Sequence, residues 1–351
     1  MEPESLPPRA PKKPWTGRLV KGAIALVAAY FTYHFLTRTS FDWSQLARRV
    51  EEASWPYLAL GVALLLARFS VWDWRYRLAA RRVAGTSSGP VLGFFVFVAS
   101  SALNLITPAA RVIGGFMRAR FFARTTGRSF GFFYGVVLYD QTAHMVVMTT
   151  CTWITVIAAA FALGRPGLGG AAASVLLAGV LTLLVWSRRR GPYEDNPLVR
   201  FLARRAEKAE GRFQRFFSHG HEAVGVFVRL LGYPDLHLKA AALGTLYFLV
   251  NAAAQWVLFL ALGEPVNPLA VITVVAVGTT AGTLSGTPGG LGTTELTMMV
   301  SFRMMGIDEV LAAAGILLYR GLHYISVLAI GLPALAILEM RGGPEELEEG
   351  G

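Results

Sequence analysis

Long runs without a single Lys, Arg, Asp or Glu dominate the pattern of hydrophobic and polar positions along this chain. Each run exceeds the roughly 20 apolar residues that an α-helix needs to cross the core of a bilayer. A soluble protein of this size buries one such helix at most, so several of them predict an α-helical membrane protein. The five clearest runs are Val83 to Ala110, Gln141 to Gly164, Pro166 to Ser187, Ala240 to Gly263, and Pro265 to Thr294.

The basic residues beside these runs predict the direction of each helix. A first helix is expected from about Leu19 to Leu36, and Lys12, Lys13 and Arg18 before it place the N-terminus in the cytoplasm. No A-x-A-like cleavage site follows, which favours an uncleaved helix over a signal peptide. A short outer loop with charged residues from Asp42 to Glu52 is expected next, and the following helix runs from Trp55 to a cytoplasmic cluster of arginines that ends at Arg82.

The stretch after Arg82 fits a hairpin better than a full crossing. Apolar residues from Pro90 to Ile106 lead to Thr107-Pro108, and the chain then continues into a segment with four arginines. A full crossing would leave those arginines outside with no opposing charge. We therefore expect a re-entrant helical hairpin that enters from the cytoplasm and turns at the proline, because proline breaks a helix.

The remaining apolar runs complete the expected topology. A second hairpin enters from outside and turns at Thr287-Pro288, and the C-terminus returns to the cytoplasm. Amphipathic helices between Asn196 and Tyr233 are expected on the inner leaflet. The other expected helices are Phe130 to Leu163, Leu168 to Trp186, Ala240 to Leu262, Pro268 to Gly286, Leu291 to Met305, and Val310 to Leu338.

The predicted fold is thus an all-α polytopic membrane protein with about six full transmembrane helices and two re-entrant hairpins. An offset of 180 residues aligns the hairpin tips, and it also aligns Leu138-Tyr139 with Leu318-Tyr319. The directions of the two halves are opposite, which predicts an inverted-topology repeat. The expected parts are a tail (1–18), a first repeat (19–187), a basic linker (188–238), a second repeat (239–340) and an acidic tail (341–351).

Composition excludes some functions and favours transport. Only 16% of residues are charged and 54% are hydrophobic, whereas soluble chains carry about 25% charged residues. The net charge of +11 comes from residues beside the spans, so nucleic acid is not an expected partner. Inverted repeats with broken helices are typical of secondary transporters, which favours a translocator in the cell (inner) membrane.

A resemblance to a known family begins in the second hairpin. The string Pro288-Gly289-Gly290-Leu291-Gly292-Thr293-Thr294-Glu295, then Gly306 and Leu317-Leu318-Tyr319-Arg320, resembles the lysylphosphatidylglycerol synthase/flippase transmembrane family. In the first half, Trp74-Arg75, Pro108, Arg111, Gly114 and Arg118 are also similar to that family. The resemblance covers nearly the whole chain.

The resemblance implies movement of a lipid between leaflets or a related membrane role. Family members often carry Gly-Glu where this chain has Gly114-Gly115, so the acid of the first half is missing. No soluble aminoacyl-transferase domain is expected, which argues against synthesis of an aminoacylated lipid. The expected function is a flippase-like translocator for an anionic phospholipid or a polyprenyl-linked lipid.

Ionisable residues at membrane depth usually face a partner or a cavity, and they supply the candidate site. Arg111 and Arg320 are expected to bind an anionic headgroup, with Glu295 and Asp140 positioning them or binding a cation. The alternative is two structural ion pairs, Glu295 with Arg320 and Arg111 with Asp140. The full candidate set is Arg111, Arg118, Tyr139, Asp140, Gly289, Gly290, Gly292, Glu295, Tyr319 and Arg320.

Other residues and functions are weaker candidates. Arg68 could line the path, and His144 and His323 could relay protons, although a helical histidine is more often simply hydrogen-bonded. An enzyme or accessory protein of lipid glycosylation or headgroup modification is the runner-up, and a scaffold is third. No catalytic constellation, cofactor or metal site is expected. Membrane lipids with anionic headgroups are the expected partners, and a homo-oligomer is left open.

Overall fold

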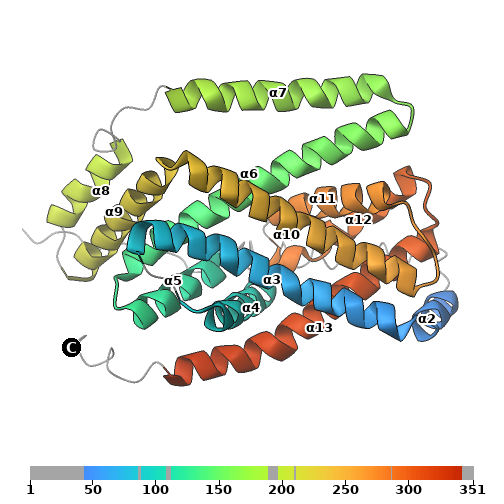
Figure 1. Cartoon of the computed structure of the whole chain (residues 1–351), viewed down its shortest axis with the longest axis horizontal. Helices are drawn as coiled ribbons and strands as arrows, with labels where there is room; N and C mark the ends of the chain where they lie inside the picture. The colour runs from blue at the N-terminus through green and yellow to red at the C-terminus, as the bar shows by residue number, and fades with distance from the viewer. Residues whose placement is uncertain are drawn as a thin grey trace, which may run out of the picture. The chain divides into compact units, whose positions relative to one another are not determined.

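The computed structural model describes residues 43–85, 88–107, 112–188, 197–208, 211–285 and 287–341 (Figure 1). Within these ranges the secondary structure is helical and contains no strand. The expected first helix and both tails lie outside the described residues, as do Pro108 and Arg111. The described part of the chain is therefore all-α, as the sequence predicts.

Four described helices are long and apolar enough to cross a membrane. Proline lies in the first turn of α3 and of α10. Backbone N–H groups in the first turn of a helix have no hydrogen-bond partner within the helix, so proline, which lacks this group, is tolerated there. The helix α7 (Pro166–Arg188) has 23 residues and carries no charged residue before Arg188. The four long helices are α3 (Trp55–Ala84), α6 (Phe130–Ala162), α10 (Pro234–Ala261) and α13 (Glu309–Arg341).

Two pairs of shorter helices form helical hairpins. In the first hairpin, α4 (Pro90–Ile106) packs against α5 (Val112–Thr126). In the second hairpin, α11 (Pro268–Leu284) packs against α12 (Thr293–Met304), and a short 3₁₀ turn, η2 (Pro288–Gly290), forms its tip. The turn of the second hairpin lies where the sequence predicted it, because proline and glycine stop a helix where the chain must reverse. The expected turn of the first hairpin at Pro108 lies outside the described residues.

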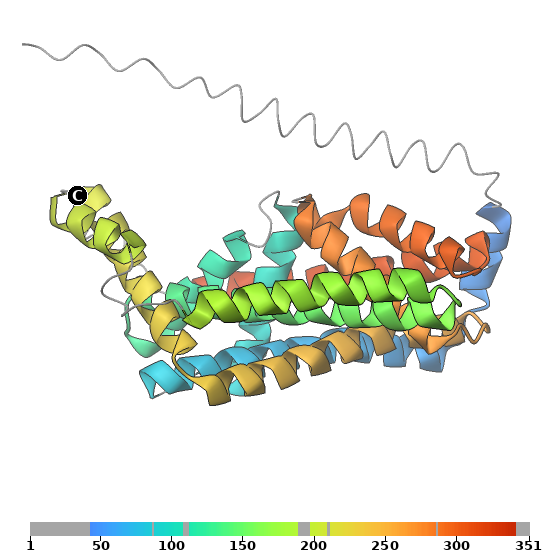
Figure 2. The same cartoon turned by 90° about the horizontal axis from the view of Figure 1, so that it is seen from above.

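Three further helices lie outside this core arrangement. The helix α2 (Trp43–Glu51) occupies a segment that the sequence suggested to be a loop, and it contacts α13. The helices α8 (Pro197–Lys208) and α9 (Gly211–Leu231) lie beside the beginning of α6, at one end of the core helices (Figures 1 and 2). They occupy the linker for which amphipathic helices were expected.

The helices fall into two series of the same order and similar length. The helices α3, α4, α5 and α6 contain 30, 17, 15 and 33 residues. The helices α10, α11, α12 and α13 contain 28, 17, 12 and 33 residues. In Figure 1, α3 runs opposite to α10, and α6 runs opposite to α13.

Each hairpin packs on the long helix of the other series. The helix α4 contacts α13, and α11 contacts α6, while α3 and α10 lie against each other. At the first of these interfaces a Cβ on Gly331 would lie 2.8 Å from the carbonyl oxygen of Val98. At the second, the hydroxyls of Thr152 and Thr280 are hydrogen-bonded at 2.9 Å. The two series are therefore interleaved and share one core.

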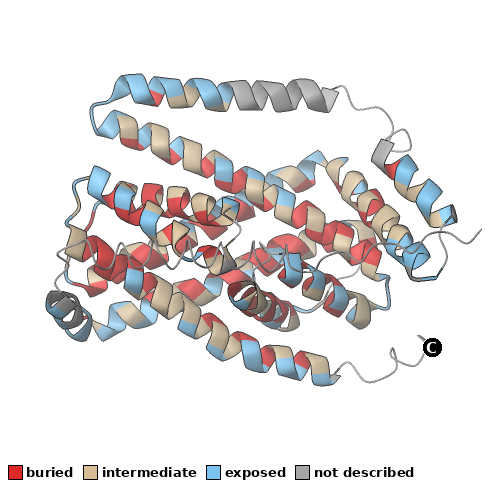
Figure 3. Ribbon diagram, turned by 180° about the vertical axis from the view of Figure 1, so that it is seen from behind, coloured by how far each residue is buried: buried red, intermediate tan, exposed pale blue. Residues whose placement is uncertain are grey.

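The long helices carry many exposed residues (Figure 3), and a number of these are large apolar ones. Ile154 on α6, Leu249 on α10 and Ile325 on α13 are examples of exposed side chains. A water-soluble monomer rarely exposes so much contiguous apolar surface. These exposed faces agree with helices that lie in a bilayer.

Candidate functional site

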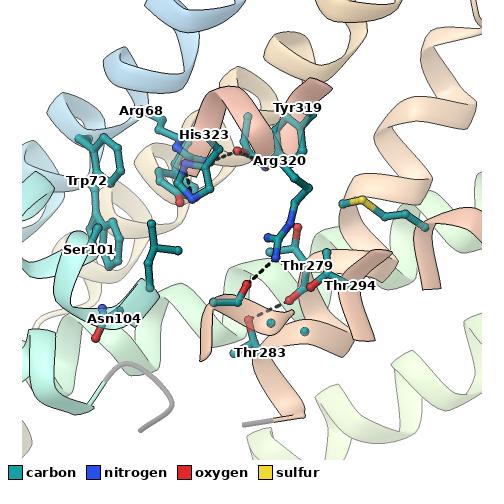
Figure 4. Close-up of a pocket in the computed structure, with 18 of the residues that line it drawn as sticks. Arg68, Trp72, Ser101, Asn104, Thr279, Thr283, Thr294, Tyr319, Arg320 and His323 are labelled. Atoms are coloured by element: carbon teal, nitrogen blue, oxygen red, sulfur yellow. Dashed lines mark hydrogen bonds between the residues drawn. The ribbon is translucent and has the colours of Figure 1, made fainter. Parts of the chain in front are cut away.

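A cavity of about 140 Å³ lies where the tips of the two hairpins meet the long helices (Figure 4). Its wall combines guanidinium, hydroxyl and amide groups with a few aromatic rings. The lining comes from α3 (Arg68, Phe69, Trp72), α4 (Ser101, Asn104, Leu105), α10 (Tyr247, Asn251), α11 (Thr279, Gly282, Thr283), the turn (Thr287, Gly289, Gly290), α12 (Thr294, Met298) and α13 (Tyr319, Arg320, His323).

Arg68 is the most enclosed cation of this cavity, with 5% of its surface exposed. Its Nη1 donates to the Oδ1 of Asn251, and its Nη2 lies 2.6 Å from the Nδ1 of His323. Within the described ranges no carboxylate forms an ion pair with Arg68. Asn251 and His323 are uncharged partners, because guanidinium only donates and the facing imidazole nitrogen must accept. The positive charge of Arg68 therefore remains uncompensated inside the protein.

Arg320 is the second cation of the cavity, and it is compensated. Its Nε donates to the Oε1 of Glu295 at 2.5 Å. Its Nη2 donates to the backbone oxygen of Gly289 at 2.8 Å and to the hydroxyl of Tyr324 at 2.9 Å. These bonds join α12, the tip of the second hairpin and α13. One arginine thus holds the hairpin tip to the long helix.

The tip itself requires glycine at Gly289. Its φ of 56° lies in the left-handed region, which other residues adopt only at a cost. A Cβ at this position would also lie 2.4 Å from the hydroxyl of Tyr324 and 3.0 Å from Leu105 of the first hairpin. The missing side chain therefore allows the two hairpins and α13 to meet at one point.

A second cluster of charges lies behind the cavity and is sealed. Asp140 accepts from the Nε1 of Trp72 at 2.7 Å and from the Nε of Arg75 at 2.8 Å. The Nη1 of Arg118 lies 4.0 Å from the same carboxylate, and its guanidinium lies over the Trp72 ring at 4.8 Å. At most 2% of the surface of Asp140, Arg75 or Arg118 is exposed. Trp72 lines the cavity and donates to Asp140, so it connects this cluster to the cavity wall.

The structure distributes the predicted site residues over these two places. Gly289, Gly290, Tyr319 and Arg320 line the cavity, and Glu295 is bonded to Arg320 behind it. Gly292 precedes α12 with a φ of 79°. Arg118 and Asp140 belong to the sealed cluster, where Arg75 pairs with Asp140. Tyr139 bonds to His237 at 2.9 Å. Arg111 lies outside the described residues.

Several lining residues were not predicted from the sequence. Arg68 was ranked low, and Asn251, whose Oδ1 also accepts from the Tyr319 hydroxyl at 3.0 Å, was not named at all. The signal for Asn251 is a polar side chain inside a charge-free run, which is unusual at membrane depth. Within the described ranges no three His, Cys, Asp or Glu side chains lie close enough to hold a metal ion.

The long apolar helices and the exposed apolar faces define a multi-pass membrane protein of helical architecture. The chain belongs to the family described as Lysylphosphatidylglycerol synthase TM region, which matches residues 18–331.

Relatives of the chain are named as membrane proteins. It is similar to a UPF0104 membrane protein of Methanocaldococcus jannaschii, with 33% identity over 100 residues that cover 28% of this chain and 30% of that protein. The match thus spans less than a third of that relative. A UPF0104 membrane protein of Methanothermobacter thermautotrophicus is 22% identical over 290 residues, covering 80% of this chain and 84% of the relative.

Proposed function

We propose that this protein is a flippase-like translocator that moves an anionic phospholipid or a polyprenyl-linked lipid between the leaflets of the cell membrane. The observation that carries the proposal is the uncompensated charge of Arg68 in the cavity between the hairpin tips. An isolated ion in a low-dielectric interior costs several kcal/mol. A phosphate group in the cavity would remove that cost, so the site favours an anion.

The place of the cavity along the helices supports transport rather than surface binding. Arg68 lies near the middle of α3, and His323 lies near the middle of α13. In a helix that crosses the bilayer, the middle residues lie near the bilayer midplane. A headgroup bound at this depth has completed half of its passage, while its apolar chains can remain in lipid.

The two series of helices support the inverted-topology repeat that the proposal includes. In it, α3 to α6 and α10 to α13 are the two repeats, and α4–α5 and α11–α12 are re-entrant hairpins. Their lengths correspond, their long helices run in opposite directions, and their hairpins pack reciprocally. Two related halves that exchange conformations give inward-open and outward-open states of similar energy. Both termini would lie in the cytoplasm.

A transport assay with two matched variants tests the function. Purified protein in liposomes is assayed for leaflet exchange of labelled phosphatidylglycerol, phosphatidylethanolamine and polyprenyl phosphate. Arg68→Gln should slow the exchange of the anionic lipids by about tenfold or more, because it removes a charge-assisted contact of about 1.5–3 kcal/mol. Arg82→Gln removes the same charge from the exposed end of α3 and should have little effect.

Two results would count against the proposal. If the unmodified protein accelerates exchange of none of these lipids, translocation of lipid is contradicted, and an enzyme or accessory role becomes the better explanation. If Arg68→Gln exchanges anionic lipids as fast as the unmodified protein, the cavity is not the site.

A further inference from the structure

The formal charge of the cavity follows from a short list of groups. Arg68 and Arg320 each contribute one positive charge, and the ion pair with Glu295 cancels that of Arg320. His323 contributes none, because its nitrogen accepts from Arg68. Among the described residues, the groups in or bonded to the cavity wall therefore sum to one positive charge.

We propose that the cavity binds a phosphate group that carries one negative charge, as a phosphodiester does. The proposal rests on the proposed function and names the class of its substrate. One negative charge would neutralise the wall, whereas a phosphate monoester or a diphosphate would bring at least one surplus charge into a buried site. A zwitterionic headgroup would bring an ammonium group beside Arg68. Both alternatives leave an uncompensated charge, which is costly in a low-dielectric site.

Uncharged donors on several sides of the cavity fit a tetrahedral anion. Ser101 and Asn104 line it from α4, Thr279 from α11 and Thr294 from α12 (Figure 4). No described residue forms a hydrogen bond with the hydroxyls of Ser101, Thr279 or Thr294. Phosphate oxygens accept hydrogen bonds in several directions, whereas a carboxylate accepts them in one plane. The spread of donors therefore favours phosphate.

The size of the cavity agrees with a single phosphate group. A volume of about 140 Å³ equals that of about four or five water molecules at roughly 30 Å³ each. A phosphate group with one or two waters fits that space. The rest of a headgroup and its chains would have to extend between the helices.

The sealed cluster does not change the choice of ligand charge. Asp140, Arg75 and Arg118 lie beyond the indole of Trp72 and do not line the cavity. They therefore offer no donor to a ligand in the cavity.

Two isosteric substitutions shift the charge of the cavity in opposite directions. Asn251→Asp adds a negative charge and keeps the acceptor that Arg68 and Tyr319 use. Glu295→Gln removes a negative charge and keeps an oxygen for Arg320. Asn267→Asp and Glu264→Gln make the same changes at exposed positions and serve as matched controls.

Binding to the purified protein in detergent is measured by native mass spectrometry at pH 8, where a phosphate monoester carries its second charge. The lipids are phosphatidylglycerol, phosphatidylethanolamine and phosphatidic acid. The unmodified protein should prefer phosphatidylglycerol. Asn251→Asp should weaken that binding at least about tenfold, and Glu295→Gln should shift the preference towards phosphatidic acid by a similar factor, since each alters a buried charge interaction at short range.

The outcomes separate the charge preference from transport. Equal binding of phosphatidylethanolamine, or unchanged preferences in both cavity variants, overturns the proposed ligand charge. A protein that prefers phosphatidylglycerol but moves no lipid contradicts only the proposed function. A soluble diester, glycerophosphoglycerol, distinguishes the source: if it fails to displace the lipid at millimolar concentration, the lipid is the ligand. If it binds as tightly as the lipid, the charge preference stands and the ligand is soluble.

Discussion

Both series of helices bury a carboxylate against an arginine, but they enclose it to different degrees. In the first series, the side chains of Asp140 and Arg75 are 1% and 2% exposed. In the second, the side chains of Glu295 and Arg320 are 24% and 11% exposed, and Arg320 lines the cavity. The first arrangement leaves no space for a ligand. The second combines a held hairpin tip with an open wall, which is where a substrate would be expected.

The difference also separates two uses of buried charge. A sealed pair between helices can fix their arrangement, because breaking it would leave a charge without a partner. A pair beside a cavity can exchange one of its contacts for a ligand at a lower cost in free energy than a sealed pair, because the charge that is released meets the ligand. The glycine at position 115, where the family often has an acid, leaves the first hairpin without a counterpart of Glu295. The two related series therefore have unequal chemistry.

The largest expected effect concerns the directions of the two series in the membrane. With Cys151 replaced by alanine, a single cysteine at Thr126 should react with a membrane-impermeant reagent only from the cytoplasm. A cysteine at Gly306 should react only from outside, because the ends of α5 and α12 lie on opposite sides in an inverted repeat. A cysteine at Gly164 provides a second external position. Labelling of Thr126 and Gly306 from the same side would exclude the inverted topology.

The next largest effect should distinguish the sealed pair from the open one. Asp140→Asn removes the buried carboxylate to which Arg75 donates at 2.8 Å and should lower the stability by about 3–5 kcal/mol. Glu295→Gln is the matched change in the second series. It should cost less, because Arg320 is partly exposed and keeps its bonds to Gly289 and Tyr324. Thermal unfolding in detergent measures both. Equal losses would show that enclosure does not distinguish the pairs.

A smaller effect tests the tip of the second hairpin. Gly289→Ala and Gly306→Ala both place a side chain at positive φ, which costs about 1–2 kcal/mol. Only the alanine at 289 would also press on Tyr324 and Leu105, since nothing lies within 4 Å of a Cβ at 306. We expect a larger loss of stability in Gly289→Ala than in Gly306→Ala, and slower lipid exchange in Gly289→Ala alone. Slower exchange in both variants would point to a general effect of strain.

The sequence was sufficient for most helix positions in the described ranges. Charge-free runs delimit the long helices, and the prolines at Pro90 and Pro268 start α4 and α11 as expected. The segment before Trp55 was harder to predict. Its charged residues suggested a loop, yet Trp43–Glu51 is a helix, since a short amphipathic segment can gain its order from a neighbour such as α13.

The site was less predictable than the fold, because its contacts join residues far apart in the chain. The pair of Glu295 and Arg320 spans 25 positions within one series, and the sequence offered it as one alternative. Arg68 and Asn251 are 183 positions apart, so neither residue indicates the other. Asp140 shows the same limit. The sequence offered Arg111 as its partner, whereas the packing of the described helices brings Arg75 to 2.8 Å from it.

The packing of α4 against α13 also has a consequence for the order of assembly. During synthesis, the first hairpin enters the membrane long before α13 exists, because α13 follows every other described helix in the chain. Until then, the surface of α4 around Val98 and Ala102, which Gly331 later covers, has no native partner. A ribosome that stops before residue 309 would release a chain with that surface exposed. In newly made copies, this surface of α4 must therefore be covered by lipid or by another protein until α13 has been inserted.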